Sequence, residues 1–345
     1  MFIVNVNGKD YQSEKDMALM DFLRDELKIT SVKDGCKEGA CGTCTVIVDG
    51  KTVRACVQKL SRLEGKKIQT IEGFTDRERE VFSYAFAAAG AVQCGFCIPG
   101  MVICGKCLID QNPNPTSEDV KQAIRTNICR CTGYAKIEEG ILLAAKMLRE
   151  NLPVPELKQT GKVGERTCRV DAVAKTLGTA KYANDYHFEG MLYGKNVFTK
   201  HARAKILSID TSKALEMPGV VAVYTAKDIP GSRYIGHLAK DWPGMIDVGE
   251  ETKCIGDTLA MVVAETKEQA VEAAKAVEVE YEVLEPIRSP KEAMVPGAHQ
   301  VHGEGFMQFG KFRIPENNLF DHEEVKRGDA ETAIANSKYV VEATF

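Results

Sequence analysis

Long apolar runs, an excess of positive charge, and early histidines are all missing from this sequence of 345 residues. No run of about eighteen apolar residues occurs, so we expect no segment to span a membrane. The formal net charge is −4, which gives no electrostatic reason to expect nucleic acid as a partner. All six histidines come after residue 186, so a metal bound earlier in the chain needs other ligands.

The sequence also lacks an export signal. Its start, "MFIVNVNGKDYQ", has neither a basic region nor an apolar core, and instead alternates around Asn7-Gly8 as a hairpin does. We therefore predict a cytoplasmic protein. In that compartment the twelve cysteines are better explained as metal ligands or thiols than as disulfides. No glycine-rich dinucleotide fingerprint or flavin domain is visible either.

Ten of the twelve cysteines lie before residue 132, and the first four form a recognisable array. The spacing C-x4-C-x2-C with a distant fourth cysteine is that of plant-type [2Fe-2S] ferredoxins. A four-thiolate zinc ribbon is the alternative, but its ligands usually come as two symmetric C-x2-C pairs. The asymmetric array favours a [2Fe-2S] cluster on Cys36, Cys41, Cys44 and Cys56.

The residues around this array predict a β-grasp-like, ferredoxin-like domain. A hairpin over residues 2–12 leads to a helix, then to the cysteine loop, then to a second hairpin that turns at Asp49-Gly50 and returns Cys56. Glycines in the loop can take positive φ, which lets the backbone wrap a cluster closely. The predicted apolar helix face is Met17, Met20, Leu23 and Leu27, and the loop glycines are Gly35, Gly39 and Gly42.

A second cysteine set lies among predicted helices. "VQCGFC" holds Cys94 and Cys97 between two apolar helical stretches, and "NICRCTGY" holds Cys129 and Cys131 between two further helices. Two cysteine pairs at helix ends could bind a second [2Fe-2S] cluster or zinc, and the residues leave both open. Another pair, Cys104 and Cys107, falls inside a helix, where buried small apolar residues explain it better than a metal does.

The rest of the chain predicts an α/β domain. After a Pro-containing linker, "DTLAMVVAETKEQAVEAAKAVEVEYEVLEP" is typical of a strand, a helix and a strand. His201 stands alone between basic and small residues, as surface or loop histidines do. The last segment, "EEVKRGDAETAIANSKYVVEATF", predicts a turn, a short helix and a strand near Val340 to Phe345. That strand would leave an unpaired edge, so we expect further protein to pack on residues 160–345.

Three motifs in one order, "DGCKEGACGTCTVIVDG", "VQCGFCIPGMV" and "NICRCTGY", resemble the iron-sulfur domains of the molybdenum hydroxylases, the xanthine dehydrogenases and aldehyde oxidoreductases. The resemblance implies an α+β multidomain fold that ends in an α/β hammerhead-like domain. The predicted boundaries are a ferredoxin-like domain over 1–76, a four-helix [2Fe-2S] domain over 77–152, a linker over 153–164, the hammerhead-like domain over 165–290, and a connector with the start of a molybdopterin-binding domain over 291–345.

The resemblance also implies site residues. Iron becomes the expected metal of the second set, held by Cys94, Cys97, Cys129 and Cys131. In the family, the glutamine before the first C-x2-C and the last cysteine of C-R-C reach the pterin, which here are Gln93 and Cys131. Residues that complete the molybdenum pocket have no counterpart in the sequence, so no catalytic residue is assigned. The molybdopterin cofactor would be bound mostly by residues outside this chain.

The function implied by the resemblance is electron transfer during hydroxylation of a purine such as xanthine, another N-heterocycle or an aldehyde. Electrons would leave a molybdopterin site through two [2Fe-2S] clusters to a flavin subunit or carrier protein. Overall likeness is greatest to the selenium-dependent, xanthine dehydrogenase-type enzymes. The alternative is an independent [2Fe-2S] electron-transfer protein with a docking domain. The α/β region and the segment after it favour the first reading, because a separate carrier would need neither.

Overall fold

The computed structural model describes residues 1–157, 161–165, 167–236, 240–301, 318–319 and 322–344. The chain forms two compact units, Met1–Tyr186 and His187–Phe345. Parts of the predicted linker and of the predicted connector lie outside the described residues. Both cysteine sets belong to the first unit, so its two sub-structures are described first.

A five-stranded sheet opens the first unit, with strand order β2-β1-β5-β3-β4. Both tight turns have positive φ at two successive residues, at Asn7-Gly8 and at Asp49-Gly50, as the sequence predicts for two-residue hairpins. Strand β5 pairs parallel with β1 and antiparallel with β3, which closes the predicted β-grasp order. The strands are β1 (Phe2–Val6), β2 (Lys9–Ser13), β3 (Thr45–Val48), β4 (Lys51–Arg54) and β5 (Lys67–Gln69).

The helix expected after the first hairpin is shorter than predicted and changes type. Helix α1 (Leu19–Asp21) continues into a π-helical turn, Phe22–Glu26, in which the Leu27 N–H donates to the Phe22 carbonyl at 3.1 Å. The wider turn brings Phe22 into the core beside Leu23. Of the predicted face, Met20 and Leu23 are fully buried and the two outer residues, Met17 and Leu27, are partly buried.

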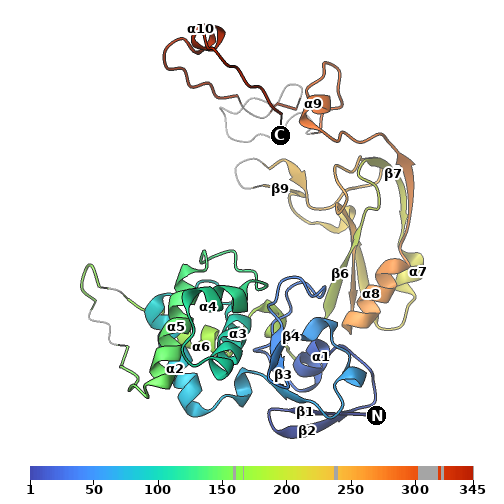
Figure 1. The fold of residues 1–345 in the computed structure, drawn as a ribbon. Coiled ribbons are helices and arrows are strands. Elements are labelled where there is room, and N and C mark those ends of the chain that lie inside the picture. Colours follow the sequence, from blue (N-terminus) through green and yellow to red (C-terminus); the bar gives the residue numbers. More distant parts are fainter. Residues whose placement is uncertain (158–160, 166, 237–239, 302–317, 320–321, 345) are drawn as a thin grey trace. The chain divides into compact units, whose positions relative to one another are not determined.

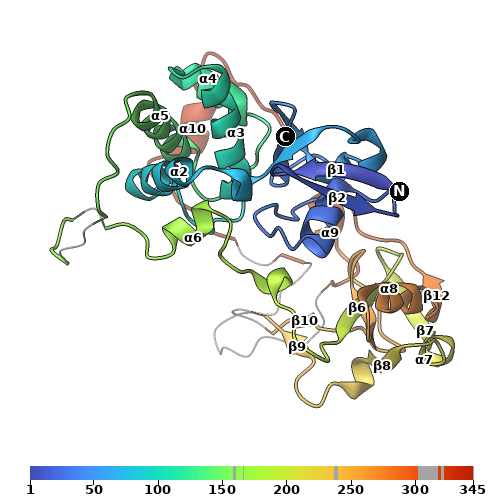
Figure 2. The same cartoon turned by 90° about the horizontal axis from the view of Figure 1, so that it is seen from below.

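Four helices follow, as predicted, and enclose a second core (Figure 2). The third begins with a capping box in which Thr116, its N-cap, and Asp119 satisfy each other's backbone N–H. The buried pair Cys104 and Cys107 lies inside the second helix. The helices are α2 (Asp76–Ala89), α3 (Ile98–Gln111), α4 (Ser117–Ile124) and α5 (Ala135–Arg149).

Several shorter helices complete the first unit, and one of them lies near the cysteines. Helix α6 (Ala172–Thr176) packs with Ala172 in the core of the four-helix bundle. The 3-10 turns are Ala55–Val57, Leu60–Arg62, Ile71–Gly73 and Ala183–Asp185.

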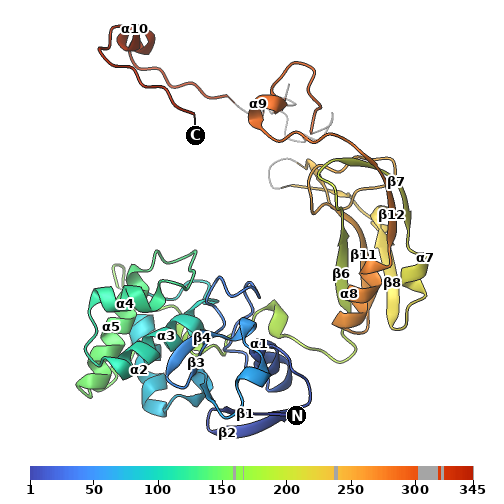
Figure 3. The same ribbon diagram turned by 45° about the vertical axis from the view of Figure 1, so that its right-hand side comes forward.

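The second unit contains the predicted strand, helix and strand. An antiparallel sheet with order β6-β11-β8 carries helix α8, and a separate pair joins β12 to β7 (Figure 3). The elements are β6 (Tyr193–Phe198), β7 (Ala204–Asp210), α7 (Ser212–Leu215), β8 (Val220–Thr225), the 3-10 turn Ala226–Asp228, β9 (Tyr234–Ile235), β10 (Trp242–Pro243), β11 (Thr258–Ala264), α8 (Lys267–Lys275) and β12 (Glu278–Val283).

The last part of the chain differs from the prediction at its final strand. Short helices α9 (Pro290–Ala293) and α10 (Ala330–Ala335) form, and the second is the expected one. Residues 338–344 form no strand, since no other described strand pairs with them, and Phe345 lies outside the described residues. Among the helices described, none is both long and apolar enough to cross a bilayer.

Candidate metal centres

The first cysteine loop surrounds its thiols with backbone N–H groups. The N–H groups of Glu38 and Cys41 both donate to the Cys36 sulfur at 3.4 Å. These bonds, that of Cys41 first, lower the pKa of the Cys36 thiol to about 7. Gly39 has the predicted positive φ.

Two other glycines of this loop serve packing. Gly35 does not have positive φ; a Cβ there would lie 2.8 Å from the Cys41 sulfur, so the position needs a residue without a side chain. Gly42 has the predicted positive φ, and a Cβ there would lie 2.7 Å from the carbonyl oxygen of Thr126 in the four-helix part. The loop is therefore packed closely both on its own thiols and on the neighbouring helices.

The second hairpin brings the fourth cysteine back as the spacing predicts. The Ala55 N–H donates to the Cys44 carbonyl at 3.1 Å, and the Cys44 thiol interacts with the backbone N–H and the thiol of Cys56. Burial raises the pKa of the Cys44 thiol to about 12. This thiol therefore needs a bound metal ion if it is to be held as a thiolate at neutral pH.

The second set of thiols gathers at the ends of helices. The Cys97 thiol interacts with that of Cys129, and the Cys94 thiol with that of Cys131. Burial raises the pKa of Cys97, while the Cys129 sulfur lies 3.1 Å from the Thr132 hydroxyl. All four cysteines that the sequence assigns to this site are thus brought together.

Each site contains two close pairs of thiols, which are Cys36 with Cys41 and Cys44 with Cys56 at the first, and Cys94 with Cys131 and Cys97 with Cys129 at the second. Within the described ranges, no three His, Cys, Asp or Glu side chains converge as they would around a single metal ion. A [2Fe-2S] cluster takes two thiolates on each of two irons, so its four ligands are spread more widely than those of zinc. Two pairs of thiols at each site match the number and arrangement of ligands that a two-iron cluster takes.

A short network joins the two cysteine loops. The Ile128 N–H donates to the carbonyl of Cys41 at 2.8 Å, so a backbone hydrogen bond links a cysteine of one set to the neighbour of Cys129 in the other. Beside it, the buried Asn127 donates from Nδ2 to the Gly42 carbonyl at 2.9 Å. The two sites are therefore in direct backbone contact.

The buried Cys104 supports this network. Burial raises the pKa of its thiol to about 12, which keeps the sulfur protonated, and the sulfur lies 3.4 Å from Asn127 Oδ1. An S–H donor at this oxygen fixes the Asn127 amide so that its nitrogen faces Gly42. Cys104 is buried, as the sequence predicts, and it has this hydrogen-bonding role in addition.

Gln93 and Cys131 lie on the exposed side of the second set. Both side chains are exposed, as is Cys94 between them in the site. Gln93 also lines a cavity of about 230 Å³, together with Thr167 and Arg169. The position is open to a ligand or another protein surface.

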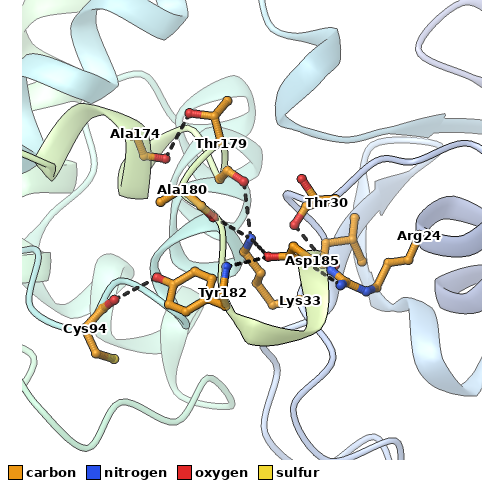
Figure 4. Close-up of polar contacts among 11 residues, drawn as sticks. Arg24, Thr30, Lys33, Cys94, Ala174, Thr179, Ala180, Tyr182 and Asp185 are labelled. Carbon is orange, nitrogen blue, oxygen red and sulfur yellow. Dashed lines mark hydrogen bonds and ion pairs between the residues drawn. The ribbon is translucent and has the colours of Figure 1, made fainter. Parts of the chain in front are cut away.

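Sequence reasoning missed a segment that covers this loop from far along the chain. The Tyr182 hydroxyl donates to the Cys94 carbonyl at 2.7 Å (Figure 4). Lys175 Nζ donates to the Gln93 carbonyl at 3.2 Å. Tyr134 was missed as well, although it ends the motif "CRCTGY"; its oxygen accepts from the Cys129 N–H at 2.9 Å. A tyrosine at a fixed offset from the cysteines was the available signal for Tyr134, and none existed for Tyr182.

Three family models match the chain in the order that these sites require. Residues 5–78 match a 2Fe-2S iron-sulfur cluster binding domain, and residues 70–142 match a second [2Fe-2S] binding domain. Residues 177–285 match the a/b hammerhead domain of aldehyde oxidase and xanthine dehydrogenase. The chain therefore has two [2Fe-2S] domains followed by a hammerhead domain, and the predicted fold class is confirmed.

Individual relatives agree with these domains. The chain is 35% identical to the aldehyde oxidoreductase of Megalodesulfovibrio gigas over 99% of its own length and 39% of that protein. It is 42% identical to the nicotinate dehydrogenase small FeS subunit of Eubacterium barkeri, over 41% of this chain and 93% of the subunit. A solved structure of the aldehyde oxidoreductase from Desulfovibrio gigas matches 88% of this chain and 36% of its own, with a TM-score of 0.78 and 36% identity.

These findings define an iron-sulfur protein of the molybdenum-containing oxidoreductases. The chain belongs to the molybdenum hydroxylase family, which includes the aldehyde oxidoreductases and xanthine dehydrogenases, as its sequence motifs predict. It spans about two fifths of the length of its aldehyde oxidoreductase relative, 39% of that protein.

Proposed function

We propose that this chain is the electron-relay portion of a molybdenum hydroxylase. The observation that carries the proposal is the hydrogen bond of 2.8 Å from the Ile128 N–H to the Cys41 carbonyl. This hydrogen bond joins the carbonyl group of Cys41, in the first set, to Ile128, the residue directly before Cys129 in the second set. A route made of covalent bonds and one short hydrogen bond suits transfer of single electrons between two clusters.

The ligand assignment is part of the proposal. We assign one [2Fe-2S] cluster to the first set and the other to the second set, with thiolate ligands throughout. One support is the pairing of the thiols. Another is the two hydrogen bonds that the Cys36 sulfur accepts from backbone N–H groups, since such bonds stabilise thiolates and raise the reduction potential of a cluster. The ligands are Cys36, Cys41, Cys44 and Cys56 for the first cluster and Cys94, Cys97, Cys129 and Cys131 for the second.

Gln93 and Cys131 are the proposed contacts to a molybdopterin. A bound molybdopterin would supply the metal centre at which substrate is oxidised. Gln93 has an amide that can both donate to and accept from a pterin edge, and its side chain is exposed beside a cavity. Cys131 would then touch the pterin and one cluster at once, which gives the electrons a direct entry to the relay.

The substrate and the partners are proposed from the relatives. Similarity along almost the whole chain is to an aldehyde oxidoreductase, so an aldehyde is the first substrate to test and xanthine the second. A small FeS subunit among the relatives supports partner chains that complete the molybdenum site and accept the electrons. A flavin subunit, selenium, the cytoplasmic location and the domain boundaries given above stay predictions.

Cluster content tests the proposal. Anaerobically purified protein should contain about four irons per chain and show two distinct [2Fe-2S] signals by electron paramagnetic resonance after reduction. Cys44→Ser should abolish one signal and leave the other, because the two ligand sets lie in separate sub-structures. Zinc at either site, or a single signal at full iron loading, would contradict the assignment.

A further inference from the structure

The segment over residues 171–185, here called the clasp, lies against the second cysteine loop and against the ferredoxin-like sub-structure just before the first loop, although the sequence places it after the linker. On the side of the second set, the hydroxyl of the clasp residue Tyr182 donates to the Cys94 carbonyl (Figure 4). The Tyr182 ring meets that of Phe96 edge-on, with 5.1 Å between the ring centres. Lys175 covers Gly95, where a Cβ would lie 2.6 Å from its side chain. The clasp therefore contacts four successive residues, 93–96, of the cysteine loop.

A buried charge cluster fastens the other end of the clasp to the first sub-structure. Lys33, three residues before Cys36, is only 1% exposed and donates to the Gly178 carbonyl at 3.2 Å. Asp185 lies 2.6 Å from Arg24 and 3.7 Å from Lys33. A buried lysine is costly unless it is paired, so these contacts hold the clasp firmly in one place.

The same cluster orients Tyr182. Asp185 Oδ2 accepts from the Tyr182 N–H at 2.9 Å, and the Lys33 ammonium lies 4.9 Å from the centre of the Tyr182 ring. Burial alone would raise the pKa of Asp185, but the Tyr182 N–H and the two cations hold it below its usual range. The charged groups of Asp185 and Lys33 thus contact Tyr182 at its backbone N–H and its ring, while its hydroxyl donates to the Cys94 carbonyl.

We infer that Tyr182 is a positioning residue for the second cluster. Its hydroxyl fixes the loop that contains Cys94 and adjusts the reduction potential of that cluster. The inference rests on the proposed ligand role of Cys94. Reduction would add negative charge to a cluster held by Cys94, and the partial negative charge on the carbonyl oxygen of that same residue would oppose it. A hydrogen bond from the Tyr182 hydroxyl offsets part of that negative charge and so favours the reduced state.

Tyr182→Phe in the full chain tests the inference, because it removes the hydroxyl and keeps the ring. We expect unchanged iron content, a more negative midpoint potential for the second cluster, and the first cluster's potential unaltered, all followed by electron paramagnetic resonance in a redox titration. Amide hydrogen exchange of the loop over residues 93–97 should become several-fold faster. Tyr84→Phe, on helix α2, which contains no cysteine, is the matched control and should change neither value.

The outcomes separate this inference from the function on which it rests. Two signals in the native protein with no response to Tyr182→Phe would overturn the inference alone, and so would equal shifts of both clusters. A native protein without the second signal would overturn the ligand assignment and the inference together. If the Tyr182→Phe variant loses iron from the second site, Asp185→Asn is the deciding variant, because it leaves the Tyr182 hydroxyl in place. A change in midpoint potential confined to the second cluster supports the positioning role. An unchanged potential refutes it.

Discussion

At the scale of single residues, Gln93 is the most informative side chain to change. Gln93→Ala removes an exposed amide but leaves all eight proposed thiol ligands and the contacts of the Gln93 carbonyl in place. If the amide holds the pterin, molybdenum retention in the native complex should fall, or reduction of the second cluster by substrate should slow by about tenfold or more. Metal analysis and stopped-flow spectroscopy measure these quantities, and iron content serves as the internal control. Native molybdenum content with a native rate would show that Gln93 makes no such contact.

Residue by residue, the sequence predicted what depends on short spacing and missed what depends on long-range contact. Within the motifs over residues 36–44, 94–97 and 129–131, the cysteines are two to five residues apart, so local turns and helix ends position them. The contacts of Cys97 with Cys129 and of Cys94 with Cys131 join two separate motifs, whose association only the family resemblance implied. Lys33 gave no signal, since an isolated lysine is usually exposed, and its partners lie some 145 residues further on. Gly35 was named among the glycines that can take positive φ, but it does not have positive φ and instead makes room for the Cys41 sulfur, a contact that no local rule describes.

At the scale of elements, the start of helix α3 presses on the first cysteine loop. A Cβ on Gly100 would lie 2.8 Å from the Gly42 carbonyl oxygen and 2.9 Å from that of Thr43, and backbone atoms cannot easily move away. The clash in Gly100→Ala should therefore lower the free energy of unfolding of the iron-sulfur unit by about 1–3 kcal/mol. The higher helix propensity of alanine offsets up to about 1 kcal/mol of this loss. Thermal unfolding of the full chain, followed by loss of cluster absorbance, measures the effect.

Gly140→Ala on helix α5 is the matched control for that prediction. There the nearest atom is a ring carbon of Phe86 at 3.3 Å, which belongs to a side chain that can adjust. The Gly140→Ala variant should lose less stability than Gly100→Ala, because the same gain in helix propensity offsets a weaker steric clash. Equal unfolding temperatures for the two variants would mean that the contact between α3 and the loop adds nothing to stability.

Elements were predictable where the apolar period was clear. Helices α2 to α5 and the strand, helix and strand of the second unit appear as expected, because each has one apolar face and local end signals. The π-helical turn after α1 was not predictable, since it arises when Phe22 is drawn into the core. The strand expected near Val340 is absent from residues 338–344, because β propensity forms no strand without a partner.

At the scale of the whole molecule, we expect relay without turnover. Hydroxylation needs an activated water, a base and a closed pocket for substrate, whereas the proposed roles of this chain concern electrons and one edge of a pterin site. The chain alone, reduced by dithionite, should pass electrons to an artificial acceptor but should not oxidise aldehydes, xanthine or other purines. Native material should run in a larger assembly by size analysis. Turnover of any of these substrates by the isolated chain would refute the division of labour.

The clasp and the residues that it contacts belong to one continuous chain, although two separate chains could make the same contacts. Residues 33 and 185 are held together inside one unit, while the stretch over 153–157 between them has neither helix nor strand. Cleavage of one peptide bond in this stretch would leave two chains, and the clasp contacts would then form an interface between them. Covalent connection supplies an effective concentration on the order of millimolar, so a nicked protein would keep its clasp only as far as that interface binds by itself, and dilution would begin to release it.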